Sequence, residues 1–457
     1  MNRSLGPVAA FNRHALLPVY YRRHGDDRLR RLQELERNQW RSAIEIGTTQ
    51  LEMTNRLIRH AYDTSLFYRQ RLADAGIHDG PIEDLSELAV MPITTKSDLQ
   101  LHCDEMISNA YKKEDLIADA SGGSTGAPTV FYKDVNRHSL RRADQIRHDQ
   151  WTGWRLGEKW ALIWGARTDL VTHRGLRERM VERYLHRCIS LDAFELDDDR
   201  IAAFIHRMKR FNPKMILGYA NALHRVAEFV LEGNLQVAVQ PRGIVSSAET
   251  LTTEAKERVS LAFECPVLDR YGSREVGLIA SDCGAGDGLH INADNLVVEI
   301  VCGDRHAEPG ETGDVIVTDL LNYGMPFIRY DLGDRATASD AKCRCGRSLP
   351  LIASVDGRQS DFLIATDGTE VHGEFFTHLF YGHPDVIQFQ VVQESREHVV
   401  LRIVPKSIDC KGDFSEITET TARVLGNGTE VSVELCDSIA PSRTGKHRFT
   451  ISKIGRD

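Results

Sequence analysis

From Leu116 onward, short β-prone runs alternate with segments of helical character, and this alternation limits the possible folds more than any other feature. The runs include WALIWG, KMILGYA, RGIVSS and CPVLDRYG, and the segments between and after them include ALHRVAEFVLEG and TTEAKERVSLAF. Strands that alternate with helices are typical of a sheet covered by helices. We therefore predict the fold class α/β for the main body of the chain.

The regions that flank this alternation have patterns of their own. Apolar residues recur at helical spacing from about Leu29 to Ala75 with no intervening Pro, which predicts an N-terminal helical region. After Gly288 the strand-like runs LVVEIV, DVIVTDL and MPFIRYDL follow closely, which predicts a β-rich subdomain. We place a domain boundary near Gly357-Arg358, with a large domain over 1–357 and a small α+β domain over 358–457.

Composition excludes several classes of function. A formal net charge of −9 argues against a general nucleic-acid binder, which needs a basic face. No apolar run approaches the roughly 18 residues of a membrane span. The nine cysteines are thinly spread and the N-terminus lacks a signal-peptide pattern, which favours reduced thiols. We expect a soluble cytoplasmic protein with neither nucleic acid nor membrane among its partners.

The segment Ser121–Pro128, SGGSTGAP, has the composition of a phosphate-binding loop. Glycines let the backbone approach phosphate oxygens, and Ser and Thr hydroxyls donate hydrogen bonds. The segment lacks the GK[ST] ending of a Walker P-loop, so kinase or GTPase chemistry is not implied. Taken alone, it is equally compatible with an ordinary polar turn.

Four further segments carry candidate chemistry, and each has an ordinary structural alternative. DRYGSRE (269–275) offers a ring that can stack on a nucleobase and a carboxylate that can hold Mg²⁺, or is simply a strand end. IRYDLGD (328–334) offers a carboxylate for ribose hydroxyls, or a turn-stabilising Asp. GRQSD (357–361) is otherwise a polar linker, and SRTGK (442–446) otherwise ends in a surface Lys.

In this order, the five segments resemble those of the adenylate-forming superfamily, and in particular the phenylacetate–CoA ligase group and its relatives associated with capsular polysaccharide clusters. The resemblance extends over nearly the whole chain, including HAYDTSLFYRQRLADAGI and LAVMPITTKSDL. It implies a large α/β adenylation domain with a mobile α+β C-terminal domain. It also implies that ATP and Mg²⁺ activate a carboxylic acid, aryl or arylacetic, as an acyl-adenylate, and that the acyl group then passes to CoA with release of AMP.

The resemblance assigns roles to individual residues. Glu275 holds Mg²⁺, Lys446 reaches the carboxylate and the α-phosphate, and Asp361 is the pivot of the C-terminal domain. Asp269 faces the adenine amine, Tyr271 stacks on the ring and Asp334 binds the ribose hydroxyls. GYAN at 218–221 lines the acyl pocket. The residues assigned to ATP and AMP are Ser121, Ser124, Thr125, Gly126, Ser247, Ala248, Glu249, Asp269, Tyr271, Gly272, Ser273, Asp334 and Arg358.

Three positions depart from the pattern of the group. Gly122 stands where many members have Ser, which removes one hydroxyl donor. Ala127 stands where Lys or Glu is frequent, and Arg274 stands where Ser or Thr is frequent. None of these departures removes a role outright, but each bears on the geometry of nucleotide and substrate.

A second constellation consists of Cys283, His290, Cys343 and Cys345. Three thiolates and one imidazole are a common set of ligands for structural Zn²⁺, and Cys-x-Cys-Gly suits two ligands on one turn. The spacing is looser than that of a zinc finger, so the residues alone leave free thiols equally open. Relatives of the phenylacetate–CoA ligase group carry a similar set, and the resemblance therefore implies a structural zinc site.

The sequence leaves the acid and the final acceptor open. An amine, a sugar or a carrier-protein thiol could replace CoA, and a related group transfers a nucleotidyl group to a deazaflavin cofactor. A non-catalytic ATP-binding protein of a polysaccharide pathway is a further alternative. The presence of Glu275, Asp334 and Lys446 argues against it, since a purely structural chain would not need all three. A homodimer is expected by analogy only.

Overall fold

The computed structural model describes residues 5–77, 81–121, 129–164, 178, 180–193, 196–233, 239–358, 362–380, 383, 385–406, 413–426, 428–439 and 449–454. The chain divides into two compact units. The large unit contains Met1–Leu332 and Ala336–Val355, and the small unit contains Gly333–Arg335 and Asp356–Asp457. Among the described residues, no helix has the length and apolar character that a membrane span requires.

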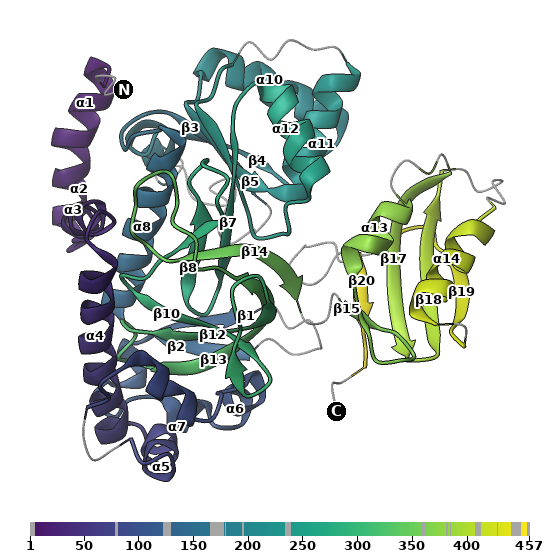
Figure 1. The fold of residues 1–457 in the computed structure, drawn as a ribbon. Coiled ribbons are helices and arrows are strands. Elements are labelled where there is room, and N and C mark those ends of the chain that lie inside the picture. The colour runs from purple at the N-terminus through teal and green to yellow at the C-terminus, as the bar shows by residue number, and fades with distance from the viewer. Residues whose placement is uncertain are drawn as a thin grey trace. The chain divides into compact units, whose positions relative to one another are not determined.

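The N-terminal region is helical, as predicted, and its helices lie along one side of the large unit (Figure 1). The predicted continuous helical stretch is interrupted at 39–42, where one helix ends and the longest helix begins. That helix starts with a capping box, in which the Ser42 hydroxyl accepts from the Glu45 backbone N–H and the Glu45 carboxylate accepts from the Ser42 N–H. The helices are α1 (Pro7–Phe11), α2 (Leu17–Arg23), α3 (Arg28–Asn38), α4 (Ala43–Thr64), α5 (Leu66–Asp74), α6 (Lys96–Leu101) and α7 (Cys103–Met106).

The large unit also contains short helices of other types. The 3₁₀-helices are η2 (Leu85–Val90), η3 (Lys113–Asp115) and η4 (Gln150–Thr152), and the π-helices are η1 (Asn12–Leu16) and η6 (Val181–Leu185).

The α/β alternation forms the parallel half of a twelve-stranded sheet, in which the order β4-β3-β5-β6-β7 is parallel throughout. Every run predicted as a strand or helix in this region is one. The strands are β3 (Trp160–Trp164), β4 (Cys188–Asp192), β5 (Met215–Tyr219), β6 (Gly243–Ser247) and β7 (Val267–Ser273). The helices are α8 (Val135–Asp149), α10 (Asp198–Phe211), α11 (Ala220–Glu232) and α12 (Thr253–Phe263).

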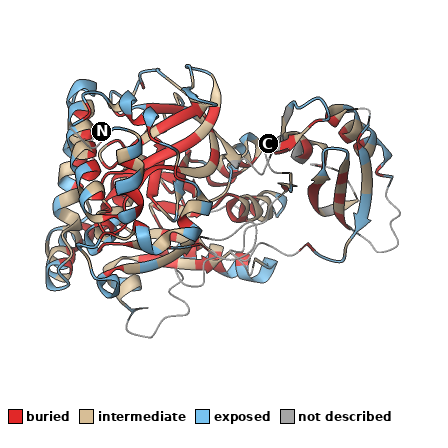
Figure 2. Cartoon of the chain, turned by 90° about the horizontal axis from the view of Figure 1, so that it is seen from below, coloured by how far each residue is buried: buried red, intermediate tan, exposed pale blue. Residues whose placement is uncertain are grey.

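Helices cover both faces of this parallel half, which is why its strands are largely apolar on both sides and mostly buried. Buried residues fill the interior of the large unit (Figure 2). Ile216 and Ile244 pack among the residues of α10, α11 and α12. Met215 and Val245, their neighbours in sequence, pack on the other face with residues of α2, α3 and α8.

The predicted β-rich subdomain continues the same sheet beyond β7, in the order β8-β9-β14-β13-β12-β10-β11. A separate antiparallel hairpin of β1 and β2 precedes α8. The strands are β1 (Ile117–Ser121), β2 (Thr129–Lys133), β8 (Gly277–Asp282), β9 (Leu289–Ile291), β10 (Leu296–Cys302), β11 (Arg305–His306), β12 (Thr312–Asp319), β13 (Phe327–Ala338) and β14 (Leu351–Arg358).

The small unit has its own core, as the predicted α+β pattern requires. Strands β17 and β18 form an antiparallel pair flanked by β19 and β20, and Leu363, Phe376 and Leu401 are completely buried among their neighbours. Its elements are β15 (Phe362–Ile364), β16 (Glu370–His372), α13 (Gly373–Phe380), β17 (Val386–Ser395), β18 (His398–Pro405), α14 (Ser415–Leu425), β19 (Glu430–Leu435) and β20 (Thr450–Ser452).

Candidate adenylation site and metal cluster

The predicted phosphate-binding loop joins the two strands of the β1–β2 hairpin. Ser121 pairs with Thr129 where the ladder of the hairpin ends. Residues 122–128, which include Ser124, Thr125 and Gly126, lie outside the described residues, as does the side chain of Ser121. The structure therefore fixes where the loop leaves one strand and enters the next.

Lys133, at the end of β2, connects this hairpin to the turn that carries Glu275. Its Nζ donates to Asp119 Oδ2 on β1 at 2.8 Å and to the backbone carbonyl of Arg274 at 2.7 Å. Only 3% of its side chain is exposed. Burial and the nearby Arg141 lower the pKa of the Lys133 ammonium to about 8, against the opposing effect of Asp119. The β1–β2 hairpin and the Glu275 turn are thus neighbours in space.

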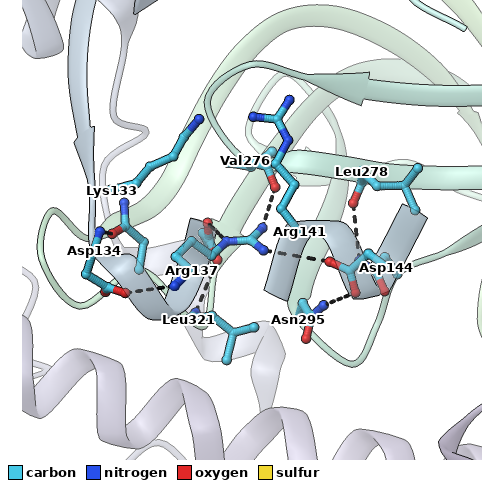
Figure 3. Close-up of polar contacts among 12 residues, drawn as sticks. Lys133, Asp134, Arg137, Arg141, Asp144, Val276, Leu278, Asn295 and Leu321 are labelled. Carbon is cyan, nitrogen blue, oxygen red and sulfur yellow. Dashed lines mark hydrogen bonds and ion pairs between the residues drawn. The ribbon is translucent and has the colours of Figure 1, made fainter. Parts of the chain in front are cut away.

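The first turns of α8 hold the other side of the same turn (Figure 3). Arg137 donates from Nη2 to the carbonyl of Val276 and from Nε to Asp319 Oδ2 at 2.7 Å. Its Nη1 lies 3.7 Å from Asp144 Oδ2, and both carboxylates are completely buried. Burial raises the pKa of Asp144 to about 6, although Arg137 opposes this. The carbonyls on both sides of Glu275 therefore have fixed donors.

The β7–β8 connection explains why the motif around Tyr271 contains a glycine. The register of the two strands shifts between Tyr271 and Gly272. A Cβ atom at Gly272 would lie 2.6 Å from the carbonyl oxygen of Gly277, a distance that no side chain tolerates. The Ser273 hydroxyl accepts from the Val276 N–H at 3.2 Å and closes the turn. Gly272 is therefore required by the bulge itself.

The residues predicted for the adenine side lie at the carboxyl ends of neighbouring parallel strands. Ser247 ends β6, and Ala248 follows it with φ of 72°, a left-handed conformation that Ala rarely adopts. Glu249 Oε2 accepts from the backbone N–H of Asn221, in the first turn of α11 after β5, at 2.9 Å. Ligands of open parallel sheets bind at this edge, so the arrangement favours a ligand site here.

Asp269 and Tyr271 lie on β7, next to β6 in the sheet. Burial raises the pKa of Asp269 to about 6, despite a hydrogen bond from the backbone of Arg270. Tyr271 is 9% exposed and packs in the core of the β-rich subdomain. The stacking role assigned to this ring remains a prediction.

The remaining predicted residues belong to the small unit. Asp334 lies on β13 and is 9% exposed. The side chain of Arg358 and the whole of Asp361 and Lys446 lie outside the described residues. Their roles also remain predictions.

Cys283, His290, Cys343 and Cys345 come together in the large unit, and their ligand atoms all lie within 4.8 Å of one another. The Sγ atoms of Cys283 and Cys343 are 3.5 Å apart, and Cys345 Sγ is 3.3 Å from His290 Nε2. Two sulfurs bound tetrahedrally at Zn–S distances of ~2.3 Å would be separated by roughly 3.7 Å. The donor set and its spacing therefore fit a tetrahedral zinc ion.

The surroundings of this cluster orient its ligands. His290 Nδ1 lies 3.2 Å from the carbonyl of Leu349, which favours the tautomer that leaves Nε2 free to bind a metal. The backbone N–H groups of Cys345 and Arg347 donate to the sulfurs of Cys343 and Cys345. Gly346 has φ of 81°, which permits the tight turn between them.

Sequence reasoning missed Lys133 and Arg137, which hold the Glu275 turn. Neither lies in a recognisable motif, and Lys133 is 141 positions from the carbonyl that it binds. The one signal available in the sequence was a lysine five residues after the predicted phosphate loop, at the end of the β-prone run TVFY.

Comparison with known proteins gives relatives over most of the chain. A family model described as the CapK C-terminal domain matches residues 363–453. Protein CapK of Staphylococcus aureus is 26% identical over 377 residues, which cover 80% of each chain. A phenylacetate-coenzyme A ligase of Pseudomonas putida is 27% identical over 423 residues, which cover 86% of this chain and 91% of the relative. The crystal structure of a 2-hydroxyisobutyryl-CoA ligase in the postadenylation state shares the fold, with a TM-score of 0.70, 19% identity and 91% of each chain covered.

Proposed function

We propose that this chain, an adenylate-forming ligase with relatives named phenylacetate-CoA ligase and CapK, activates a carboxylic acid with ATP and then passes the acyl group to CoA. The acid that we propose is an aryl or arylacetic acid. This assignment rests on the resemblance of the motifs and on the name of the Pseudomonas relative.

The chemistry explains why such a chain needs several convergent polar groups. A carboxylate is a poor electrophile because its negative charge repels nucleophiles. When its oxygen attacks the α-phosphorus of ATP, the bond to the bridging oxygen breaks and pyrophosphate leaves. The thiolate of CoA then attacks the acyl carbon and AMP leaves. Charge concentrates on phosphate oxygens in the first step, so donors and cations must be in place beforehand.

One observation carries the proposal: Lys133 ties the hairpin of the predicted phosphate loop to the carbonyl next to Glu275. The hairpin strands on either side of the predicted phosphate loop and the turn that carries Glu275 are therefore held next to each other, which supports a shared site for the phosphates and Mg²⁺. Mg²⁺ held by Glu275 would neutralise charge on the phosphate oxygens. We propose that Ser247, Ala248, Glu249, Asp269 and Tyr271 bind the adenine side, at the sheet edge that the fold offers to ligands.

We propose that the C-terminal domain acts as a lid whose Lys446 reaches the reacting carboxylate and the α-phosphate. Asp334 and Arg358 would bind the ribose, and Asp361 would be the pivot. Two half-reactions with different nucleophiles require different side chains at one site, and a hinge supplies that exchange.

We also propose that Cys283, His290, Cys343 and Cys345 bind a structural Zn²⁺. Four protein ligands leave no open coordination position, so the metal would stabilise the β-rich subdomain and take no part in catalysis. The cluster joins the end of β8, β9 and the connection between β13 and β14, which are distant in sequence.

A pyrophosphate-release screen over carboxylic acids, with and without CoA, tests the proposed function. We expect release with ATP and an aryl or arylacetic acid, and thioester formation only when CoA is present. Release without thioester would indicate an amine, a sugar or a carrier-protein thiol as the acceptor. Transfer of AMP to a hydroxyl of the substrate, with no acyl-adenylate, would indicate nucleotidyl transfer. Absence of release with every acid and acceptor would overturn the ligase assignment.

A further inference from the structure

A cleft of about 520 Å³ opens in the large unit at the end of α8 remote from Lys133 and Arg137. Because α8 has 15 residues, the length of this helix, roughly 20 Å, separates the cleft from the Glu275 turn. Five arginines and one carboxylate contribute to the lining of the cleft: Arg13, Arg147, Arg155, Arg242, Arg347 and Glu36. These arginines are spread along the chain from position 13 to position 347, so no local motif reveals the cluster.

The positive charge of this cleft is only partly balanced. Arg147 pairs with Asp294, and Arg242 makes two hydrogen bonds to the Glu158 carboxylate. The guanidinium of Arg13 makes no hydrogen bond or ion pair with any described residue.

Arg347 is held by an amide oxygen, by two aromatic rings and by the sulfur of Cys345. Its Nε donates to the neutral amide oxygen of Gln39 at 2.9 Å, and its guanidinium lies against the rings of Trp40 and Trp151. No carboxylate among the described residues pairs with it. The aromatic contacts fix the plane of the guanidinium, so its terminal donors point in a defined direction at little entropic cost.

Arg147, which contributes to the lining of the cleft, holds one buried donor without a partner, as several other arginines of the described residues do. Arg147 is 1% exposed, and among the described residues its Nε has no hydrogen-bond partner. A buried donor without a partner is costly, and native structures keep few of them. The one lining carboxylate, Glu36, accepts from the Gln150 side chain at 2.6 Å. The net positive charge of the side chains that line the cleft therefore favours an anionic ligand.

We propose that this cleft binds a small molecule that carries a phosphate group, at a site separate from the nucleotide site. Planar guanidinium groups match the oxygens of a phosphate through paired hydrogen bonds. A phosphate could accept hydrogen bonds from Arg13 and Arg347 together, and the lining stays positive overall although Glu36 contributes one negative charge. The volume of the cleft lies within the range typical of small-molecule sites. Since the chain as a whole carries a charge of −9, a positive cleft is a local feature and not a general property of the surface.

Intrinsic fluorescence can test this site, because three of the five tryptophans, Trp40, Trp151 and Trp154, line the cleft. The full-length protein is titrated with inorganic phosphate at constant ionic strength, with chloride as the reference anion. We expect a saturable change with phosphate and none with chloride. The variant Arg13→Gln/Arg347→Gln should weaken the apparent affinity at least tenfold. The control variant is Arg305→Gln, which removes an exposed arginine on β11 that pairs with Glu311. This variant should leave the apparent affinity for phosphate unchanged.

Three outcomes would overturn the proposal. They are a response that does not saturate, an equal response in the double variant, and a response that saturating AMP abolishes, which would place the phosphate in the nucleotide site. The single variant Arg13→Gln provides the test if the double variant misfolds, because the Arg13 guanidinium makes no hydrogen bond or ion pair with a described residue. This single variant should weaken phosphate binding several-fold while the unfolding curve stays that of the parent protein. Unaltered binding in it would also contradict the proposal.

Discussion

The contacts of Lys133 lead to a prediction about the Mg²⁺ requirement of catalysis. Lys133→Met removes the donor to Asp119 and to the carbonyl of Arg274, and it leaves both acceptors without that partner. We expect the Mg²⁺ concentration needed for half-maximal pyrophosphate release to rise about tenfold, because the Glu275 turn loses one of its fixed donors. The free energy of unfolding should fall by about 1–3 kcal/mol. Assays of pyrophosphate release over a range of Mg²⁺, together with urea denaturation, measure both effects.

Two variants control this experiment. Lys133→Arg keeps a cationic donor and should recover part of the Mg²⁺ affinity. Lys113→Met removes an exposed lysine that pairs with Asp104 at 2.5 Å, and it should change neither quantity. An unchanged Mg²⁺ requirement in Lys133→Met, in protein that is merely less stable, would show that Lys133 has a structural role only.

The buried carboxyl of Asp269 leads to a prediction about pH, because burial raises its pKa to about 6 from the ordinary Asp value of about 4. Between these values the folded state binds more protons than the unfolded state, so stability falls as pH rises through the window. The full cost is present at pH 7. Asp269→Asn should therefore increase the free energy of unfolding at pH 7 by about 1–2 kcal/mol, a figure reduced for the partial exposure of the side chain. Urea denaturation at pH 7 and pH 4 measures this difference, which should nearly vanish at pH 4.

The same variant should bind AMP more weakly, since Asp269 is the proposed partner of the adenine amine. Asp437→Asn, on the small unit, is the control and should alter neither stability nor AMP binding. Equal stability of Asp269→Asn and the parent protein at pH 7 would mean that the carboxyl is not buried as described.

Candidate residues could be predicted from the sequence only where they stand together in a short motif. Gly272 stands in a recognisable motif, and the bulge of β7 explains its presence. Lys133 and Arg137 act on carbonyls 141 and 139 positions away, so no local pattern reveals them. The arginines of the cleft escaped prediction for the same reason.

At the scale of elements, the strands of the parallel half were predictable because both of their faces are buried and their sequences are therefore continuously apolar. The order of the strands was not, since β14 inserts between β9 and β13 by contacts that no periodicity encodes. The interruption between α3 and α4 was missed because apolar spacing continues through it, although Ser42 and Glu45 form a readable capping box.

The Cys-His cluster joins three elements of the β-rich subdomain. We predict that a zinc ion bound there stabilises these elements. We expect about one equivalent of zinc in purified protein by elemental analysis. Cys343→Ser should lose the metal and lower the melting temperature, because metal binding adds to the free energy of folding. Cys436→Ser, on the small unit, should keep the metal. Protein that contains no zinc after purification without chelators would refute the metal assignment.

At the scale of the whole molecule, the described core of each unit is its own, so the two units can respond separately to a ligand. The core of the small unit is formed around Leu363, Phe376 and Leu401. The proposed adenine-side residues, from Ser247 to Tyr271, all belong to the large unit. The adenine contacts of AMP should therefore stabilise the large unit, while the proposed ribose contacts of Asp334 and Arg358 belong to the small unit.

This separation gives a test of Lys446 that distinguishes catalysis from binding. Lys446→Ala should abolish acyl-adenylate formation, because it removes the cation proposed for the developing charge on the α-phosphate. It should leave most of the rise in melting temperature that saturating AMP produces, because the adenine-side residues are untouched. Calorimetry with AMP and a pyrophosphate assay on the same preparation measure the two effects, with the surface variant Lys453→Ala as the control. Near-normal adenylation in Lys446→Ala would remove the lid from the proposed mechanism, whereas loss of the AMP response would show that Lys446 is needed for binding as well as for catalysis.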